Sequence, residues 1–286
     1  MMIASWQKMG SINPKSLTEA RLQLHHAIQF PAAVGNCLIE PQPDTSHASL
    51  TWHPQLNLLV SGFVTTEKPF QVALEPVSLT LIILNLQGEK LAEFSLEQKT
   101  MEQGMNWLKI AIEPWGAKVE KLTFIPYPED FSVRPLALGT PFEKHLSAQR
   151  QELTAYYANT NLLLQEIVAT TEGASAIRIW PHHFDLATLI SLPYIQKGEA
   201  TSIGVGMSPG DSNYDEPYWY VSPWPYPNLA NFPELNGGGN WQTEGWLGAI
   251  LTASNLSQEN KQSGQIQAFF NSAVDALLTL LEGNQD

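Results

Sequence analysis

Helical patterns and runs of strand-forming residues do not alternate along this chain of 286 residues. A helical pattern comes first, and several short runs rich in β-branched and aromatic residues follow it. A second series of such runs lies between two long helical patterns in the C-terminal half. Parallel sheets need a crossover helix after nearly every strand, and that alternation is missing here. The order therefore predicts an α+β fold of two lobes, each an antiparallel sheet with helices packed on it.

The individual elements are predicted from the spacing of apolar residues and from turn-forming residues. In the first helix, Ser16 and Glu19 form a predicted capping box, and Pro31 ends or kinks the helix. The predicted helices are residues 16–37, 101–112, 142–170 and 258–281. The predicted strands are residues 49–52, 58–64, 70–74, 78–85, 91–96, 121–127, 176–180, 186–191, 202–207, 218–221 and 247–252.

A stretch rich in proline and glycine, residues 128–141, is the predicted boundary between the lobes. We predict an N-terminal α+β lobe of residues 1–135 and a C-terminal α+β lobe of residues 136–286. The same elements are also compatible with one compact domain. The C-terminal lobe carries an aromatic, acidic segment, residues 180–246.

The composition excludes several classes of protein. The hydrophobic fraction of 43% and the charged fraction of 15% exclude a disordered chain. The 28 acidic and 15 basic residues give a net charge of −13, which argues against a nucleic-acid partner. Cys37 is the only cysteine, so no intrachain disulfide can form. The N-terminus shows no secretory signal and no apolar run reaches membrane-spanning length, so we expect a cytoplasmic protein that is not in a membrane.

The segment of residues 180–246 concentrates the unusual chemistry. It holds five of the nine tryptophans and five of the eight tyrosines, with seven acidic residues and one basic residue, Lys197. Aromatic rings beside carboxylates suit a cation, a metal ion or a polyhydroxylated ligand, and they do not suit a phosphate. In the alternative, which stays open, proline- and tryptophan-rich loops pack as rigid surface structure over a sheet.

The sharpest motif is Trp180-Pro-His-His-Phe-Asp185. If it is a strand, His183 and Asp185 lie on one face and His182 on the other. The pair could ligate a divalent ion, with His47 as a further ligand if the lobes pack face to face. It could instead form a catalytic histidine base oriented by an acid. In the alternative, Asp185 binds backbone amides in a turn while one histidine is buried and hydrogen-bonded.

Two further stretches supply candidate ligand-binding residues. Gly204-Val-Gly-Met-Ser-Pro-Gly-Asp211 predicts a strand that ends in a tight turn, because it matches neither dinucleotide nor P-loop spacing. In the strand that follows, Tyr218 and Tyr220 share one face and Trp219 lies on the other. We expect one of these faces to belong to the core and the other to form an aromatic wall. The predicted ligand-binding residues are Trp180, His182, Ser208, Asp211, Tyr218, Trp219, Tyr220 and Trp224.

Three stretches together resemble a mainly bacterial family that is classed only as a domain of unknown function. They are residues 25–54, residues 180–187 with a Trp…Phe-Asp-Leu-Ala motif, and residues 206–227 with a Pro-Gly turn and a Tyr-rich strand. His182 and His183 stand where that family has small residues. The resemblance implies a shared fold and no known activity. The residues that match are Trp180, Phe184, Asp185, Pro209, Gly210 and Tyr220.

Two functional hypotheses follow from these patterns. The first is a small-molecule or metal-binding pocket around residues 180–185, in its sharpest form a hydrolase that uses a divalent metal or a base formed by His183 and Asp185. The second is a non-catalytic binding or assembly module that uses the aromatic, proline-rich segment as an interface. The sequence leaves open whether the protein is an enzyme, whether it binds a divalent metal or any other cofactor, and whether it is a monomer or a homodimer.

Overall fold

The structure is a computed structural model, and the chain in it forms two compact units that are each assembled from segments separate in the sequence. For this reason the units differ from the predicted lobes 1–135 and 136–286. The residues that the structure describes are 5–125, 130–227, 232–257 and 259–282. Of these, the first unit contains residues 17–154 and 178–184, and the second contains residues 5–16, 155–177 and 185–282.

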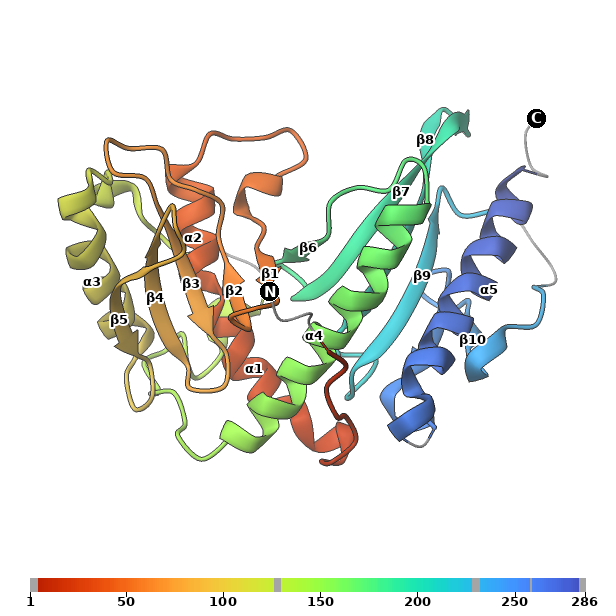
Figure 1. Cartoon of the computed structure of the whole chain (residues 1–286), viewed down its shortest axis with the longest axis horizontal. Helices are drawn as coiled ribbons and strands as arrows, with labels where there is room; N and C mark the ends of the chain where they lie inside the picture. Colours follow the sequence, from red (N-terminus) through yellow and green to blue (C-terminus); the bar gives the residue numbers. More distant parts are fainter. Residues whose placement is uncertain (1–4, 126–129, 228–231, 258, 283–286) are drawn as a thin grey trace. The chain divides into compact units, whose positions relative to one another are not determined.

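The first unit combines an antiparallel sheet with helices (Figure 1). Its strands lie in the order β1-β2-β3-β4-β5, as expected for a series of hairpins without crossover helices. They are β1 (Thr51–His53), β2 (Leu58–Val60), β3 (Phe70–Glu75), β4 (Thr80–Asn85) and β5 (Lys90–Ser95). The helices are α1 (Thr18–Ala27), α2 (Gln29–Leu38) and α3 (Met101–Ile112).

Helices α2 and α3 approach closely in the core of this unit. A Cβ atom added to Gly104 on α3 would lie 2.6 Å from Cζ of Phe30, which is fully buried on α2. Glycine is therefore the residue that lets the two helices meet. The predicted bounds of α3, residues 101–112, are confirmed. Thr100 and Gln103 form a capping box that fixes the start of this helix.

The predicted first helix is interrupted, and its capping box is wrong. Residues 14–17 form a 3₁₀ turn in which the Ser16 hydroxyl donates to the carbonyl oxygen of Asn13, so it does not cap a helix. The kink falls at Ile28, between α1 and α2. Pro31 lies in the first turn of α2, where its missing N–H would have no intrahelical partner in any case.

Two further predictions are wrong, one for a strand and one for the start of a helix. Residues 122–125 are not a strand, because they pair with no other strand among the described residues, and residues 126–127 lie outside those residues. The long helix α4 (Ser147–Thr170) begins five residues later than predicted. Its predicted first residue, Phe142, instead donates its backbone N–H to the carbonyl of Lys99.

The second unit is built around a long antiparallel hairpin (Figure 1). The second sheet has the strand order β10-β11-β9-β8-β7-β6, and its strands β7 to β11 belong to this unit. The hairpin turn is Lys197-Gly198, and both residues have positive φ, as a two-residue hairpin turn requires. The hairpin consists of β7 (Asp185–Gln196) and β8 (Glu199–Ser208). The other strands of the second sheet are β6 (Arg178–Trp180), β9 (Tyr218–Trp224), β10 (Asn240–Gln242) and β11 (Gly248–Thr252).

One face of this sheet is the core of the second unit. Trp219 on β9 is fully buried, and its indole N–H donates to the hydroxyl of Thr160 on α4 at 2.8 Å. The amphipathic helix α5 (Gln262–Glu282) contacts β8, β9 and β11 and buries residues such as Phe270 and Leu277. Among the described residues, no helix combines the length and the apolar character needed to cross a membrane.

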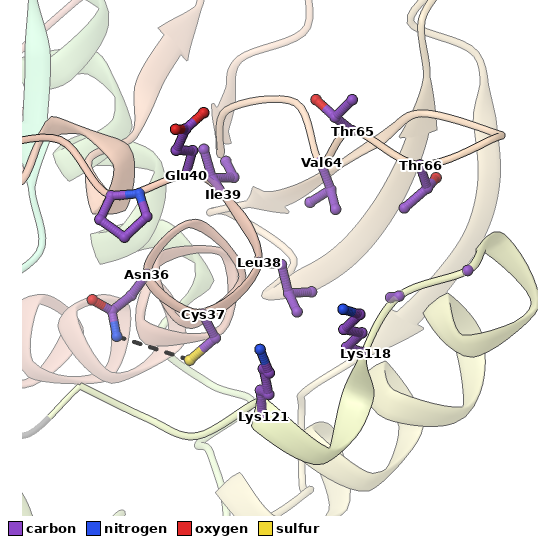
Figure 2. A pocket seen from close by; sticks show the side chains of 13 residues that line it. Asn36, Cys37, Leu38, Ile39, Glu40, Val64, Thr65, Thr66, Lys118 and Lys121 are labelled. Carbon is purple, nitrogen blue, oxygen red and sulfur yellow. Dashed lines mark hydrogen bonds between the residues drawn. The ribbon is translucent and has the colours of Figure 1, made fainter.

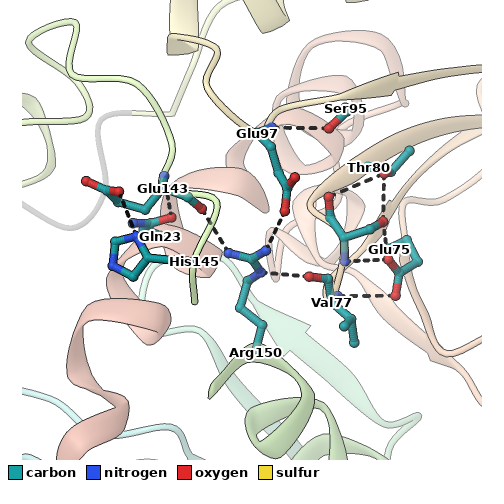
Figure 3. Close-up of polar contacts among 10 residues, drawn as sticks. Gln23, Glu75, Val77, Thr80, Ser95, Glu97, Glu143, His145 and Arg150 are labelled. Atoms are coloured by element: carbon teal, nitrogen blue, oxygen red, sulfur yellow. Dashed lines mark hydrogen bonds and ion pairs between the residues drawn. The ribbon is translucent and has the colours of Figure 1, made fainter. Parts of the chain in front are cut away.

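A buried arginine links three segments of the first unit (Figure 3). The guanidinium of Arg150, at the start of α4, donates to the carbonyl of Val77 at 2.8 Å and to the carbonyl of Glu143 at 3.0 Å. It also forms an ion pair with the Glu97 carboxylate at 2.9 Å. Burial lowers the pKa of Arg150, and Glu97 opposes that shift. All three contacts are needed because the side chain has no exposed surface.

We expect Arg150→Met to lower the free energy of unfolding by about 3–5 kcal/mol, because it leaves Glu97 and two carbonyl groups without this donor. The free energy of unfolding would be measured by urea denaturation at pH 7. The matched control is Arg134→Met, which removes a partly exposed ion pair with Asp130 and should cost no more than about 1 kcal/mol. Equal losses for the two variants would contradict the role of Arg150.

Candidate functional site

The motif of residues 180–185 is a turn between two strands and not a strand. Trp180 ends β6 and Asp185 begins β7, and the backbone N–H of Phe184 donates to the carbonyl of Trp180 at 2.7 Å. Phe184 has a φ of 58°. The prediction that His183 and Asp185 share a strand face is therefore wrong, because strand alternation does not apply across this turn.

This turn is anchored within the first unit by side chains of α1 and α2. The His25 ring donates from Nε2 to the carbonyl of Pro181 at 2.8 Å, and the Gln29 amide donates to the same carbonyl at 3.0 Å. Phe184 is fully buried and stacks on His25, with ring centroids 5.5 Å apart. Burial lowers the pKa of His25 to about 4. These contacts give Pro181 and Phe184 a structural role.

The predicted histidines lie in different surroundings. His182 is half-buried, with its ring centroid 4.5 Å from that of His183 and 6.0 Å from that of Trp180. Burial lowers the pKa of His182 to about 4, and His183 adds to this shift. His183 is exposed. The Nδ1 atom of His47 accepts a hydrogen bond from the backbone N–H of Gln42 at 3.1 Å.

The divalent metal that the sequence predicts gains no support from the side-chain geometry. Across the described residues, no group of three or more His, Cys, Asp or Glu side chains could hold a metal ion. A protein site for a divalent metal ordinarily needs three or four such ligands. The assignment of His47, His183 and Asp185 to a metal thus stays a prediction without a structural basis.

In the second unit, two aspartates accept hydrogen bonds from two tyrosines of β9. The Tyr220 hydroxyl donates to Asp185 at 2.5 Å, and the Tyr218 hydroxyl donates to Asp211 at 2.6 Å. Burial, with the adjacent aspartate, raises the pKa of each tyrosine well above its usual value. Both tyrosines therefore stay protonated donors at neutral pH, and their rings, 6.3 Å apart, follow one sheet face.

Gly206 makes room for the Tyr220 hydroxyl. It lies opposite Tyr220 in the ladder between β8 and β9. A Cβ atom at Gly206 would lie 2.9 Å from that hydroxyl and 2.6 Å from the carbonyl oxygen of Leu186. The contact between Tyr220 and Asp185, which joins β9 to the start of β7, thus requires a residue without a side chain between them.

Three other predicted ligand-binding residues have distinct positions. Trp219 is part of the core, so its assignment to a ligand-binding wall is wrong. Ser208 is buried and its hydroxyl accepts from the backbone N–H of Gly210, which makes it part of the turn after β8. Trp224 is 47% exposed, and its indole N–H donates to Glu199 at 2.7 Å.

The face of the sheet opposite Trp219 carries exposed apolar side chains that the sequence interpretation missed. Leu189 and Ile195 on β7 are 46% and 72% exposed. By the register of the hairpin they lie opposite Gly204 and Ala200, and Ser202 lies opposite Trp224. Period-two alternation along β7 was the signal that could have identified them.

No family model, no curated protein and no solved structure matches this chain. The resemblance to a bacterial family of unknown function therefore stays a prediction, and the function has to be argued from geometry.

We expect Gly206→Ala to lower the free energy of unfolding by about 1–3 kcal/mol, because the added methyl group collides with Tyr220 and the Leu186 carbonyl. Gly204→Ala is the matched control on the same strand and face, since its nearest neighbours lie 3.8 Å or more from an added Cβ. It should change stability by less than about 1 kcal/mol. Urea denaturation measures both variants, and equal effects would contradict the close contact at Gly206.

We expect stability to fall as the pH falls from 6.5 to about 4, with His25 contributing. Its folded pKa of about 4 lies below the ordinary value of 6.5, so the unfolded chain binds a proton first and acid favours unfolding. His25→Gln should flatten the dependence of the urea midpoint on pH in this window. His145→Gln, at an exposed position, is the control. An unchanged slope for His25→Gln would contradict the assignment.

Proposed function

We propose that this protein is a non-catalytic binding module. Its second unit binds a basic, amphipathic segment of a partner protein on the sheet face opposite Trp219. We call this surface the open face and define it by Leu189, Ile195, Gly204, Tyr220 and Trp224. The observation that carries the proposal is the exposure of large apolar side chains on β7 and β9, on the same face of the sheet and on either side of β8.

The open face has the features of an anchoring surface. Trp224 and Ile195 project from β9 and β7, and the strand between them offers mainly small residues, including Ser202 and Gly204. Trp224 is held by its hydrogen bond to Glu199 and packs edge-on against Tyr226 at 5.6 Å. A side chain that is already fixed loses little entropy when a partner covers it, so it suits a binding anchor.

The charge of the segment favours a basic partner. Residues 180–246 carry seven acidic residues and Lys197 as the one basic residue. The Lys197 ammonium group donates to the carbonyl of Tyr226. A second copy of the chain would bring another net charge of −13 to the interface, which disfavours self-association. Lysine or arginine side chains beside apolar anchors complement the open face better.

The side-chain chemistry favours binding over hydrolysis. The Asp185 carboxylate accepts a hydrogen bond from Tyr220, and the raised pKa of Tyr220 keeps this tyrosine a donor. Such a pair fixes the orientation of both side chains and engages one oxygen of the carboxylate. The hydrolase hypothesis with His183 and Asp185 stays a prediction that no contact described above supports.

The proposal is tested with two synthetic peptides, an amphipathic helix of leucine and lysine and its counterpart with glutamate in place of lysine. Fluorescence anisotropy of the labelled peptides measures binding at low and high salt. We expect the protein to bind the basic peptide, and more weakly as salt increases. The double variant Ile195→Ala/Trp224→Ala should bind about tenfold more weakly or worse, since truncating an interface anchor typically costs more than about 1 kcal/mol.

Ile110→Ala is the matched control, because Ile110 is 71% exposed but lies on α3 in the first unit. It should bind the basic peptide as the unmodified protein does. Thermal unfolding of each variant verifies that the fold is retained. Equal binding by the double variant, or equal binding of the acidic peptide, would exclude the open face as a docking site for basic segments.

A further inference from the structure

A cavity of about 440 Å³ lies in the first unit beside the C-terminal end of α2 (Figure 2). This volume falls within the range of about 300–1,000 Å³ that is typical of small-molecule pockets. Leu38, Ile39 and Val64 contribute apolar surface to its lining. Sequence reasoning missed this cavity because its lining comes from three separate stretches of the first 121 residues.

Two lysines point into the cavity from one short turn. Lys118 precedes the 3₁₀ turn η4 (Val119–Lys121) and Lys121 is its last residue, and in such a turn side chains three residues apart lie on the same side. Figure 2 shows both ammonium groups directed toward the cavity. Neither lysine forms an ion pair with another residue in the part of the chain that the structure describes. Both lysines are exposed to solvent, and two positive charges on one short turn attract an anion that can contact both of them.

The negative groups around the cavity do not neutralise this pair. Glu40 also lines the cavity, but Figure 2 shows it on the opposite side with its carboxylate directed away from the lysines. The C-terminal end of α2 carries a partial negative charge of about half an elementary charge. Glu120 lies between the two lysines in the sequence, but neither Glu120 nor Glu40 forms an ion pair with them among the described residues.

We propose that this cavity binds a small organic dianion with a short apolar body, a phosphate monoester or a dicarboxylate. The two lysines match two negative charges, and the apolar wall accommodates a short carbon chain or ring. This site is separate from the open face, and neither proposal requires the other.

Cys37 provides a specific readout, because it is the only cysteine of the chain and lines this cavity. Its alkylation by uncharged N-ethylmaleimide would be followed by mass spectrometry with phenyl phosphate, glutarate, inorganic phosphate or the monoanion butyrate present. Phenyl phosphate or glutarate should slow alkylation about tenfold at ten times its dissociation constant, because the free fraction falls to about one tenth. Butyrate should protect much less. Protection by phenyl phosphate alone or by glutarate alone identifies the anionic group, and either result supports the site.

The variants Lys118→Gln and Lys121→Gln should each lose this protection while they keep the thermal unfolding temperature of the unmodified protein. Lys99→Gln, an exposed lysine outside the cavity, should retain full protection. The proposed site does not exist if neither phenyl phosphate nor glutarate slows alkylation of the unmodified protein. The same conclusion follows if these anions protect both lysine variants as strongly as they protect the unmodified protein.

Discussion

The buried guanidinium of Arg150 is the contact on which the first unit depends. It brings together the turn between β3 and β4, the segment that leaves β5, and the chain that leads into α4. A buried cation is tolerated only when its donors are satisfied, so these three segments can take few other arrangements. Helix α3 starts soon after Glu97, and the chain beyond α3 forms the turn with Lys118 and Lys121.

The second unit depends on the division of its sheet into two faces. Trp219 and its neighbours on one face pack against α4 and α5, and the buried indole N–H finds its partner in Thr160. Because alternate side chains of a strand point to opposite faces, burial of Trp219 turns Tyr220 and Trp224 to the other side. The tyrosines of that face are satisfied by aspartates, while Leu189, Ile195 and Trp224 stay exposed. A surface that is apolar, fixed and bordered by acids suits a basic partner better than catalysis.

The elements that the sequence predicted well are those whose signals are local. Helix α3 has its predicted bounds because its cap residues, Thr100 and Gln103, lie next to the apolar pattern. All strands of both sheets except β10 were predicted, because residues that form strands cluster there, whereas the short β10 (Asn240–Gln242) lies in a segment rich in glycine and asparagine and was missed. The failures have a common cause. Residues 122–125 pair with no strand among the described residues, and Asp185 accepts a hydrogen bond from a tyrosine 35 positions away. Each outcome depends on which groups meet in space.

The sequence by itself determined the α+β class, the antiparallel type of the sheets and the acidic, aromatic character of residues 180–246, because periodicity and composition act within a few residues of chain. Only the tertiary structure decided that residues 180–185 form a turn held by His25 and Gln29, and that Trp219 is core. It also decided that Lys118 and Lys121 face the same cavity as Cys37. These features arise from packing and hydrogen bonds between residues far apart in the chain, and no local pattern records such contacts.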